Sequence, residues 1–103
     1  KPMKPILPPP PAGTVEVYTS TGARQCEAGG FTLEDRRNEL KAAGVQVLVA
    51  SCGTDGRMYT AVCGGTSSAI YIFTIPAKDW PKVKATFDLV SKLPEADKVP
   101  CRE

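Results

Sequence analysis

Four cysteines most constrain how this chain of 103 residues can fold: Cys26, Cys52, Cys63 and Cys101. An even number of cysteines in a short chain predicts two structural disulfides in an oxidising compartment. Zinc-binding cysteines usually come in pairs two to four residues apart, but here no two are closer than 11 positions, which argues against zinc. The Cys-x-x-Cys motif of thioredoxin-like redox centres is also absent. A free, reactive Cys63 or Cys101 is the alternative.

The composition predicts one globular domain. With 42% hydrophobic and 23% charged residues, the chain has neither the apolar deficit of disordered proteins nor a membrane-length apolar run. The 13 basic and 11 acidic residues give a net charge of +2 and form no dense basic run, so we expect no nucleic-acid partner. Histidine is absent, which removes the commonest general base and transition-metal ligand. We therefore expect neither an enzyme nor a cofactor or metal site.

The N-terminal stretch predicts an extended tether over residues 1–13. This stretch holds six of the ten prolines, and such a sequence cannot join a sheet and favours polyproline II. Because the chain begins with lysine, we expect that a signal peptide was removed, with a lipoprotein-like membrane tether at the lost N-terminus. Two P-x-x-P patterns, at 2–5 and 5–8, leave docking on an aromatic groove as an alternative.

Local patterns predict four strands after the tether. Alternating and β-branched residues favour these strands, and Asp55-Gly56 predicts a hairpin turn between the second and third. A helix is expected between the first two strands, with Thr32 as its N-cap and Gly44 as its C-terminal stop. The expected strands are 14–19, 45–51, 58–63 and 69–76, and the helix is 33–43.

A second helix is expected from Asp79, because Pro81 is tolerated in a first turn. Its apolar stripe would consist of Trp80, Val83, Phe87 and Val90, and Pro94 would end it. The order strand, helix, three-stranded meander, helix predicts an α+β fold, a four-stranded β-sheet with two helices packed on one face and two disulfides. Residues 14–93 would form this single domain and 94–103 a C-terminal tail.

Strand direction predicts how the cysteines pair. If short connections reverse each element, Cys26 and Cys52 come to one end of the sheet. The third strand would carry Cys63 to the other end, where the tail brings Cys101. A bond between Cys52 and Cys63 is disfavoured, because the expected hairpin would hold them more than about 7 Å apart. We therefore expect the pairs Cys26–Cys52 and Cys63–Cys101.

Three stretches, "QCEAGG", "ASCGTDGRMYTAVCGG" and "IYIFTIPA", resemble a group of small, uncharacterised exported or lipoprotein-like proteins of Gram-negative bacteria. The similarity covers roughly residues 18–76. It implies a periplasmic or secreted location, and it supplies no activity and no site to transfer.

The predicted fourth strand suggests a partner surface, because it is apolar on both faces. With both helices on one face, either Ile70 and Ile72 or the set Tyr71, Phe73 and Ile75 must face away. We take Tyr71, Phe73 and Ile75 as a candidate surface for a protein partner or a weak dimer. The alternative is that the tail or a loop covers this face.

The function that these patterns favour is a tethered, non-catalytic interaction module, active as a monomer or weak dimer. A second hypothesis is an inhibitor of a periplasmic or extracellular enzyme, in which a loop fixed by a disulfide enters an active site. Arg24, Glu27, Asp55 and Arg57 lie in the loops that would do so. Glu27 and Asp55 could also form a catalytic carboxylate pair, but so small a fold offers little cleft.

Overall fold

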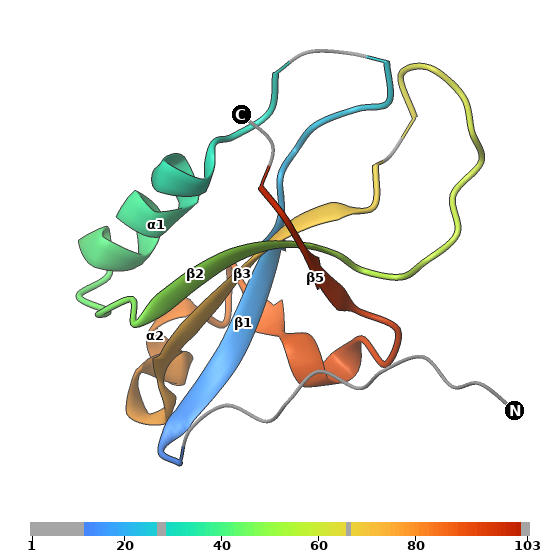
Figure 1. Cartoon of the computed structure of the whole chain (residues 1–103). Helices are drawn as coiled ribbons and strands as arrows, with labels where there is room; N and C mark the ends of the chain where they lie inside the picture. The colour runs from blue at the N-terminus through green and yellow to red at the C-terminus, as the bar shows by residue number, and fades with distance from the viewer. Residues whose placement is uncertain (1–11, 27–28, 66, 102–103) are drawn as a thin grey trace, which may run out of the picture.

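The centre of the fold is β3 (Ala69–Pro76), an apolar strand that pairs on both edges. β1 (Thr14–Ser20) lies on one side of it and β2 (Val49–Thr54) on the other. Two short strands complete the sheet: β4 (Asp88–Leu89) pairs with β1, and β5 (Asp97–Val99) pairs with β2. The computed structural model describes residues 12–26, 29–65 and 67–101. In this part of the chain the strands form one antiparallel sheet in the order β4-β1-β3-β2-β5 (Figure 1).

The helix α1 (Leu33–Ala42) confirms the predicted caps. Thr32 accepts a hydrogen bond from the Asp35 N–H, and the Asp35 carboxylate accepts one from the Thr32 N–H, which forms a capping box. Gly44 has φ of +79°, a value that glycine adopts without strain, and the chain turns there toward β2. The second helix, α2 (Trp80–Val83), directly follows the 3₁₀ turn η1 (Ala77–Asp79), and a second 3₁₀ turn, η2 (Val90–Lys92), comes after β4.

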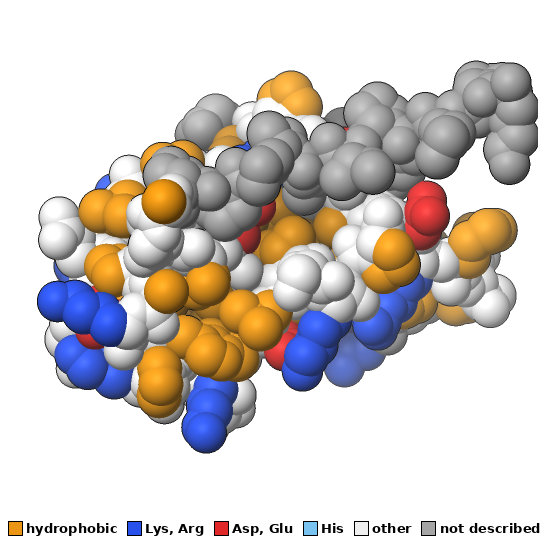
Figure 2. Space-filling view, turned by 90° about the horizontal axis from the view of Figure 1, so that it is seen from below, with side chains coloured by type: hydrophobic (Ala, Val, Ile, Leu, Met, Phe, Trp, Pro, Cys, Tyr) orange, Lys and Arg blue, Asp and Glu red, His pale blue; other side chains and the backbone are white. Residues whose placement is uncertain are grey.

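Each face of the sheet carries its own hydrophobic core. The first core joins Phe73 and Ile75 of β3 to Leu40 of α1 and Val83 of α2, so both helices pack on one face, as predicted. The second core lies on the opposite face and consists of Ile70, Ile72, Val90, Leu93 and Ala96. The segment 90–96 therefore covers the sheet face that the helices leave open. This agrees with the alternative that the tail or a loop covers that face. Figure 2 shows the underside of the molecule, where hydrophobic side chains lie among Lys and Arg side chains.

The long second helix predicted from the apolar stripe is wrong beyond Val83. The N–H groups of Thr86 and Phe87 both donate to the Val83 carbonyl, at 3.0 and 2.8 Å, and the chain then leaves the helix. Asp88 and Leu89 pair with β1 instead and cover its outer edge. The stripe therefore divides, because Val83 and Phe87 enter the first core and Val90 the second.

The predicted third strand, 58–63, is also wrong. This stretch lies in a loop that runs from the end of β2 to the start of β3, and β2 pairs directly with β3. The other edge of β2 is taken by β5, with Thr54 opposite Asp97 and Cys52 opposite Val99. The sheet thus has five strands rather than four, and the predicted tail supplies one of them. Lys98 of β5 also forms an ion pair of 2.8 Å with Glu16 of β1.

All four cysteines form disulfides, as predicted, but the expected pairing is wrong. The bonds are Cys26–Cys63, with Cα atoms 5.0 Å apart, and Cys52–Cys101, with Cα atoms 5.1 Å apart. The predicted pairing depended on a third strand that would carry Cys63 across the sheet. Because 58–63 is a loop, Cys63 stays at the end that holds Cys26, and the antiparallel β5 brings Cys101 beside Cys52. A free, reactive Cys63 or Cys101 is excluded by these bonds.

Candidate functional site

The candidate site is the long connection between β2 and β3, and we call its described residues, 55–65 and 67–68, the pinned loop. In Figure 1 it extends beyond the sheet beside the connection between β1 and α1. The Cys26–Cys63 disulfide joins these two connections. Cys26 has φ of +66°, an uncommon backbone conformation for a residue with a side chain, and the disulfide helps to hold it. The pinned loop is thus fixed near its C-terminal end by a covalent bond.

Gln25 holds the pinned loop with four hydrogen bonds. Its N–H donates to the Gly65 carbonyl at 3.0 Å, and its carbonyl accepts from the Gly64 N–H at 2.9 Å. Its side-chain amide donates to the Thr60 carbonyl at 2.9 Å and accepts from the Val62 N–H at 3.2 Å. One residue therefore supplies hydrogen-bond partners to backbone groups along half of the loop, which does not pair with a strand.

Arg24 adds one more bond to the same end of the loop. Its guanidinium donates to the Gly64 carbonyl at 3.0 Å. The sequence placed Arg24, Asp55 and Arg57 in loops at one end of the fold. The structure brings all three to the pinned loop or its contact with residues 24–26, and Arg24 and Arg57 are exposed. Glu27 lies outside the described residues.

Asp55 fixes the N-terminal end of the pinned loop. Its side chain is buried and its carboxylate accepts from the Arg57 N–H at 2.9 Å and from the Tyr59 hydroxyl at 2.6 Å. The hydrogen bond to this carboxylate, with the partial burial of the phenol, raises the pKa of Tyr59 above its usual range. Asp55 therefore holds the residues on both sides of Met58 and does not form the predicted hairpin turn.

The pinned loop presents apolar side chains to solvent. Met58 is 95% exposed and Val62 53% exposed, and Tyr59 between them is 36% exposed. Among the exposed large apolar side chains of the described residues, Met58 has the greatest exposure. The pinned loop therefore presents an exposed apolar segment on a fixed base.

Phe31, on the neighbouring connection, is 47% exposed and is also held in place. The Arg36 guanidinium lies 3.9 Å from the centre of its ring and donates to the Ser20 carbonyl at 3.0 Å. The Tyr71 hydroxyl donates to the Phe31 carbonyl at 2.7 Å. Partial burial, followed by the charge of Asp35, raises the pKa of Tyr71.

The predicted partner surface on β3 does not exist as an exposed patch. Phe73 and Ile75 are fully buried in the first core, and Tyr71 is half-buried against it. The prediction failed because the helices cover this face of β3, and the other face is covered by residues 90–96.

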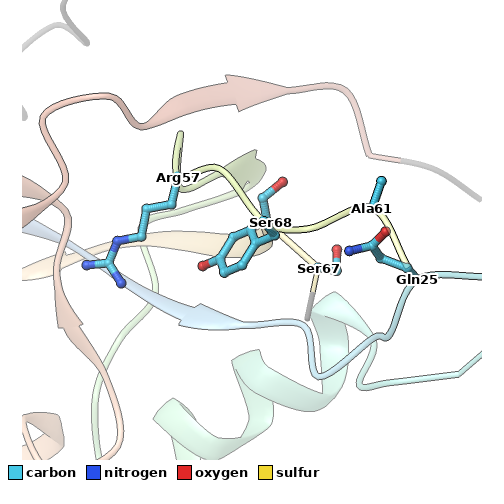
Figure 3. A pocket seen from close by; sticks show the side chains of 6 residues that line it. Gln25, Arg57, Ala61, Ser67 and Ser68 are labelled. Atoms are coloured by element: carbon cyan, nitrogen blue, oxygen red, sulfur yellow. The ribbon is translucent and has the colours of Figure 1, made fainter. Parts of the chain in front are cut away.

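A shallow polar pocket of about 220 Å³ lies along the pinned loop. Figure 3 shows Gln25, Ala61 and Ser67 near one end of it and Arg57 at the other. Tyr59 and Ser68 complete the lining. Amide, hydroxyl and guanidinium groups of this kind can hydrogen-bond to a peptide backbone that lies against the loop.

Sequence reasoning missed Met58, Val62 and Gln25. The pattern around Met58 predicts a strand, in which alternate residues would be half-buried. A polar Gln25 beside a cysteine gives no signal of its own, because its four partners are 35 to 40 positions away.

Two further properties concern only the part of the chain that the structure describes. Its His, Cys, Asp and Glu side chains form no group of three or more that could hold a metal ion. Its helices include none that is long and apolar enough to cross a membrane. Comparison with known protein families, with curated proteins and with solved structures finds no match.

Proposed function

We propose that this protein is a non-catalytic binding module of an exported, oxidising compartment, and that the pinned loop is its contact element for a protein partner. The two disulfides are compatible with such a compartment. The proposed location also agrees with the resemblance to exported proteins. The predicted tether at residues 1–13 falls almost wholly outside the described residues and is not needed for this proposal.

The observation that carries the proposal is the exposure of Met58 on a loop whose base is fixed at both ends. Asp55 holds one end, and Gln25 with the Cys26–Cys63 disulfide holds the other. A loop that is ordered before binding loses less conformational entropy when a partner docks. Exposed apolar side chains then supply the buried contact area, as anchor residues do in protein interfaces.

Capture of partners with matched variants tests the proposal. Wild type, Met58→Asp with Val62→Asp, and a control with Lys84→Ala would be immobilised and exposed to exported proteins of the source organism. Lys84 is exposed on the C-cap of α2, away from the loop. We expect proteins that wild type and the control retain and the loop variant loses. Retention of the same proteins by all three forms would contradict the proposal.

The second candidate function is inhibition of a periplasmic or extracellular enzyme. The specific observation in its favour is the double contact of Asp55 on either side of Met58, because a loop that enters an active site must keep its shape there.

A further inference from the structure

We propose that the pinned loop binds in the active site of a serine endopeptidase, and that Met58 enters the apolar primary specificity pocket of that enzyme. This inference rests on the proposed function, since it takes the pinned loop as the contact element. It adds the class of partner, the residue that determines specificity and the reason why the loop would resist cleavage.

The backbone around Met58 has the shape that an endopeptidase accepts. Residues 55–62 contain neither a hydrogen-bonded turn nor a bend, and no residue from 57 to 62 has a positive φ. An extended segment can add to an enzyme as a strand, with alternate side chains entering pockets. Within the described residues, the Met58 backbone makes no hydrogen bond to the rest of the chain, so its N–H and carbonyl are available to an enzyme.

Met58 has the side chain for an apolar primary pocket. It is unbranched, flexible and 95% exposed, so it can enter a slot without rearrangement of the loop. An apolar slot selects such a side chain, whereas a pocket with a carboxylate at its base selects Lys or Arg. Arg57, the preceding residue, is also exposed, but its N–H is bonded to Asp55 and is not available for a strand contact.

Asp55 explains how the loop could survive in an active site. In peptide cleavage the serine oxygen forms a bond to the Met58 carbonyl carbon, and the bond from that carbon to the Tyr59 nitrogen breaks. The proton of the serine hydroxyl passes through the enzyme's own base to the Tyr59 amine. The Asp55 carboxylate binds the N–H of Arg57 on one side of this bond and the hydroxyl of Tyr59 on the other.

Both chain ends created by cleavage between Met58 and Tyr59 would therefore stay in place. Tyr59 remains tied to Asp55 through its hydroxyl, and the chain beyond it is held by Gln25 and the Cys26–Cys63 disulfide. A tethered amine has a high effective concentration beside the acyl-enzyme. It re-forms the peptide bond faster than it leaves, so the enzyme stays occupied and the loop acts as an inhibitor.

Inhibition assays with purified chymotrypsin, subtilisin and trypsin test this inference. Chymotrypsin and subtilisin accept large apolar side chains, and trypsin accepts Lys and Arg. We expect wild type to inhibit the first two and to leave trypsin active. Met58→Ala should weaken inhibition by about 30-fold or more, the effect of losing a central anchor. Lys84→Ala, a change of an exposed residue at the C-cap of α2, is the control and should change inhibition by less than about 3-fold.

Two further variants make the test specific. Met58→Lys should transfer inhibition from chymotrypsin to trypsin, because the surrounding loop is unchanged and only the pocket preference is altered. Tyr59→Phe removes a single hydroxyl from the Asp55 contact. It should leave binding within about 3-fold but raise the rate of cleavage between Met58 and residue 59, measured by mass spectrometry. Circular dichroism would check that each variant is folded.

Two outcomes would overturn the inference: rapid cleavage of the wild-type loop without inhibition, or no effect on either chymotrypsin or subtilisin. The capture experiment remains a separate test. If capture is lost in the Met58→Asp, Val62→Asp variant but no protease is inhibited, the partner class is wrong and the binding module stands. If that variant captures the same proteins as wild type, the proposed function fails as well.

Discussion

Phe87 shows how a single side chain closes the first core. Its ring meets that of Phe73 edge to face, with centroids 6.0 Å apart and planes at 79°. The burial of Phe87 was predicted correctly although its helix was not, because the cost of exposing an aromatic ring does not depend on the element that carries it. Met58 is the opposite case: its hydrophobicity favoured burial, and only the structure shows it in solvent.

Phe87→Ala should lower the free energy of unfolding by about 3 to 5 kcal/mol, because it removes a buried ring and leaves a cavity. Urea denaturation would measure the change. Thr86→Ala, at the exposed neighbouring position, is the control and should be nearly neutral. A midpoint for Phe87→Ala equal to that of wild type would mean that Phe87 lies outside the core.

Tyr59 should titrate above the ordinary tyrosine value of about 10, because its hydroxyl donates to the Asp55 carboxylate. A pKa raised by folding stabilises the native state below the unfolded value, and this contribution is lost as the pH rises through the folded value. The pinned loop should therefore loosen only above about pH 10. Ultraviolet absorbance of tyrosinate, compared between wild type and Tyr59→Phe, would isolate this step. A step at or below the ordinary value would contradict the Asp55 contact.

Elements differ in how well the sequence predicts them, and the difference follows from where their partners lie. The helix α1 carries its own stop and start signals, because Thr32 and Asp35 cap each other and Gly44 ends it. β4 and β5 have two and three residues, too few to show any periodicity. The false strand at 58–63 contains the strand-forming residues Tyr59, Thr60 and Val62, but β3 and β5 occupy both edges of β2.

Thr32→Ala should lower the free energy of unfolding by about 1 kcal/mol, because it removes the side chain that accepts from the Asp35 N–H. Thermal or urea unfolding would give the value. Asn38→Ala, at an exposed position within α1, is the matched control and should not destabilise the protein. Equal stability of the two variants would show that the capping box does not form in solution.

The fold class of the whole molecule is predicted correctly, but the order of its connections and the pairing of its cysteines are not. An α+β fold with two helices on one face of an antiparallel sheet follows from local patterns, and the structure confirms it. The cysteine pairing depends on the path of every segment between the cysteines, so one misplaced strand at 58–63 exchanged the partners. The predicted surface at Tyr71, Phe73 and Ile75 failed because the helices pack on that face of β3. The segment 90–96, predicted as the end of a helix and a tail, covers the other face.

Replacing Cys52 and Cys101 together by Ala should cost about 4 kcal/mol, the chain-entropy value for a closed loop of 49 residues. It should also release β5, so that the amides of β2 and β5 exchange hydrogen faster. The double variant of Cys26 and Cys63 opens a loop of similar length, 37 residues, and serves as the control. It should lose comparable stability, while the pinned loop rather than β2 gains exchange. Identical exchange at β2 in both variants would contradict the assigned pairing.

The two disulfides interleave, because the first cysteine in the chain pairs with the third and the second with the fourth. A chain that crosses a membrane from its N-terminal side presents Cys26 and Cys52 to oxidants before either correct partner arrives. Rapid oxidation would then join these two and produce a wrong bond that only thiol–disulfide exchange can correct. The yield of native protein in an oxidising compartment should therefore depend on a disulfide isomerase, and in its absence the trapped form should carry Cys26 bonded to Cys52.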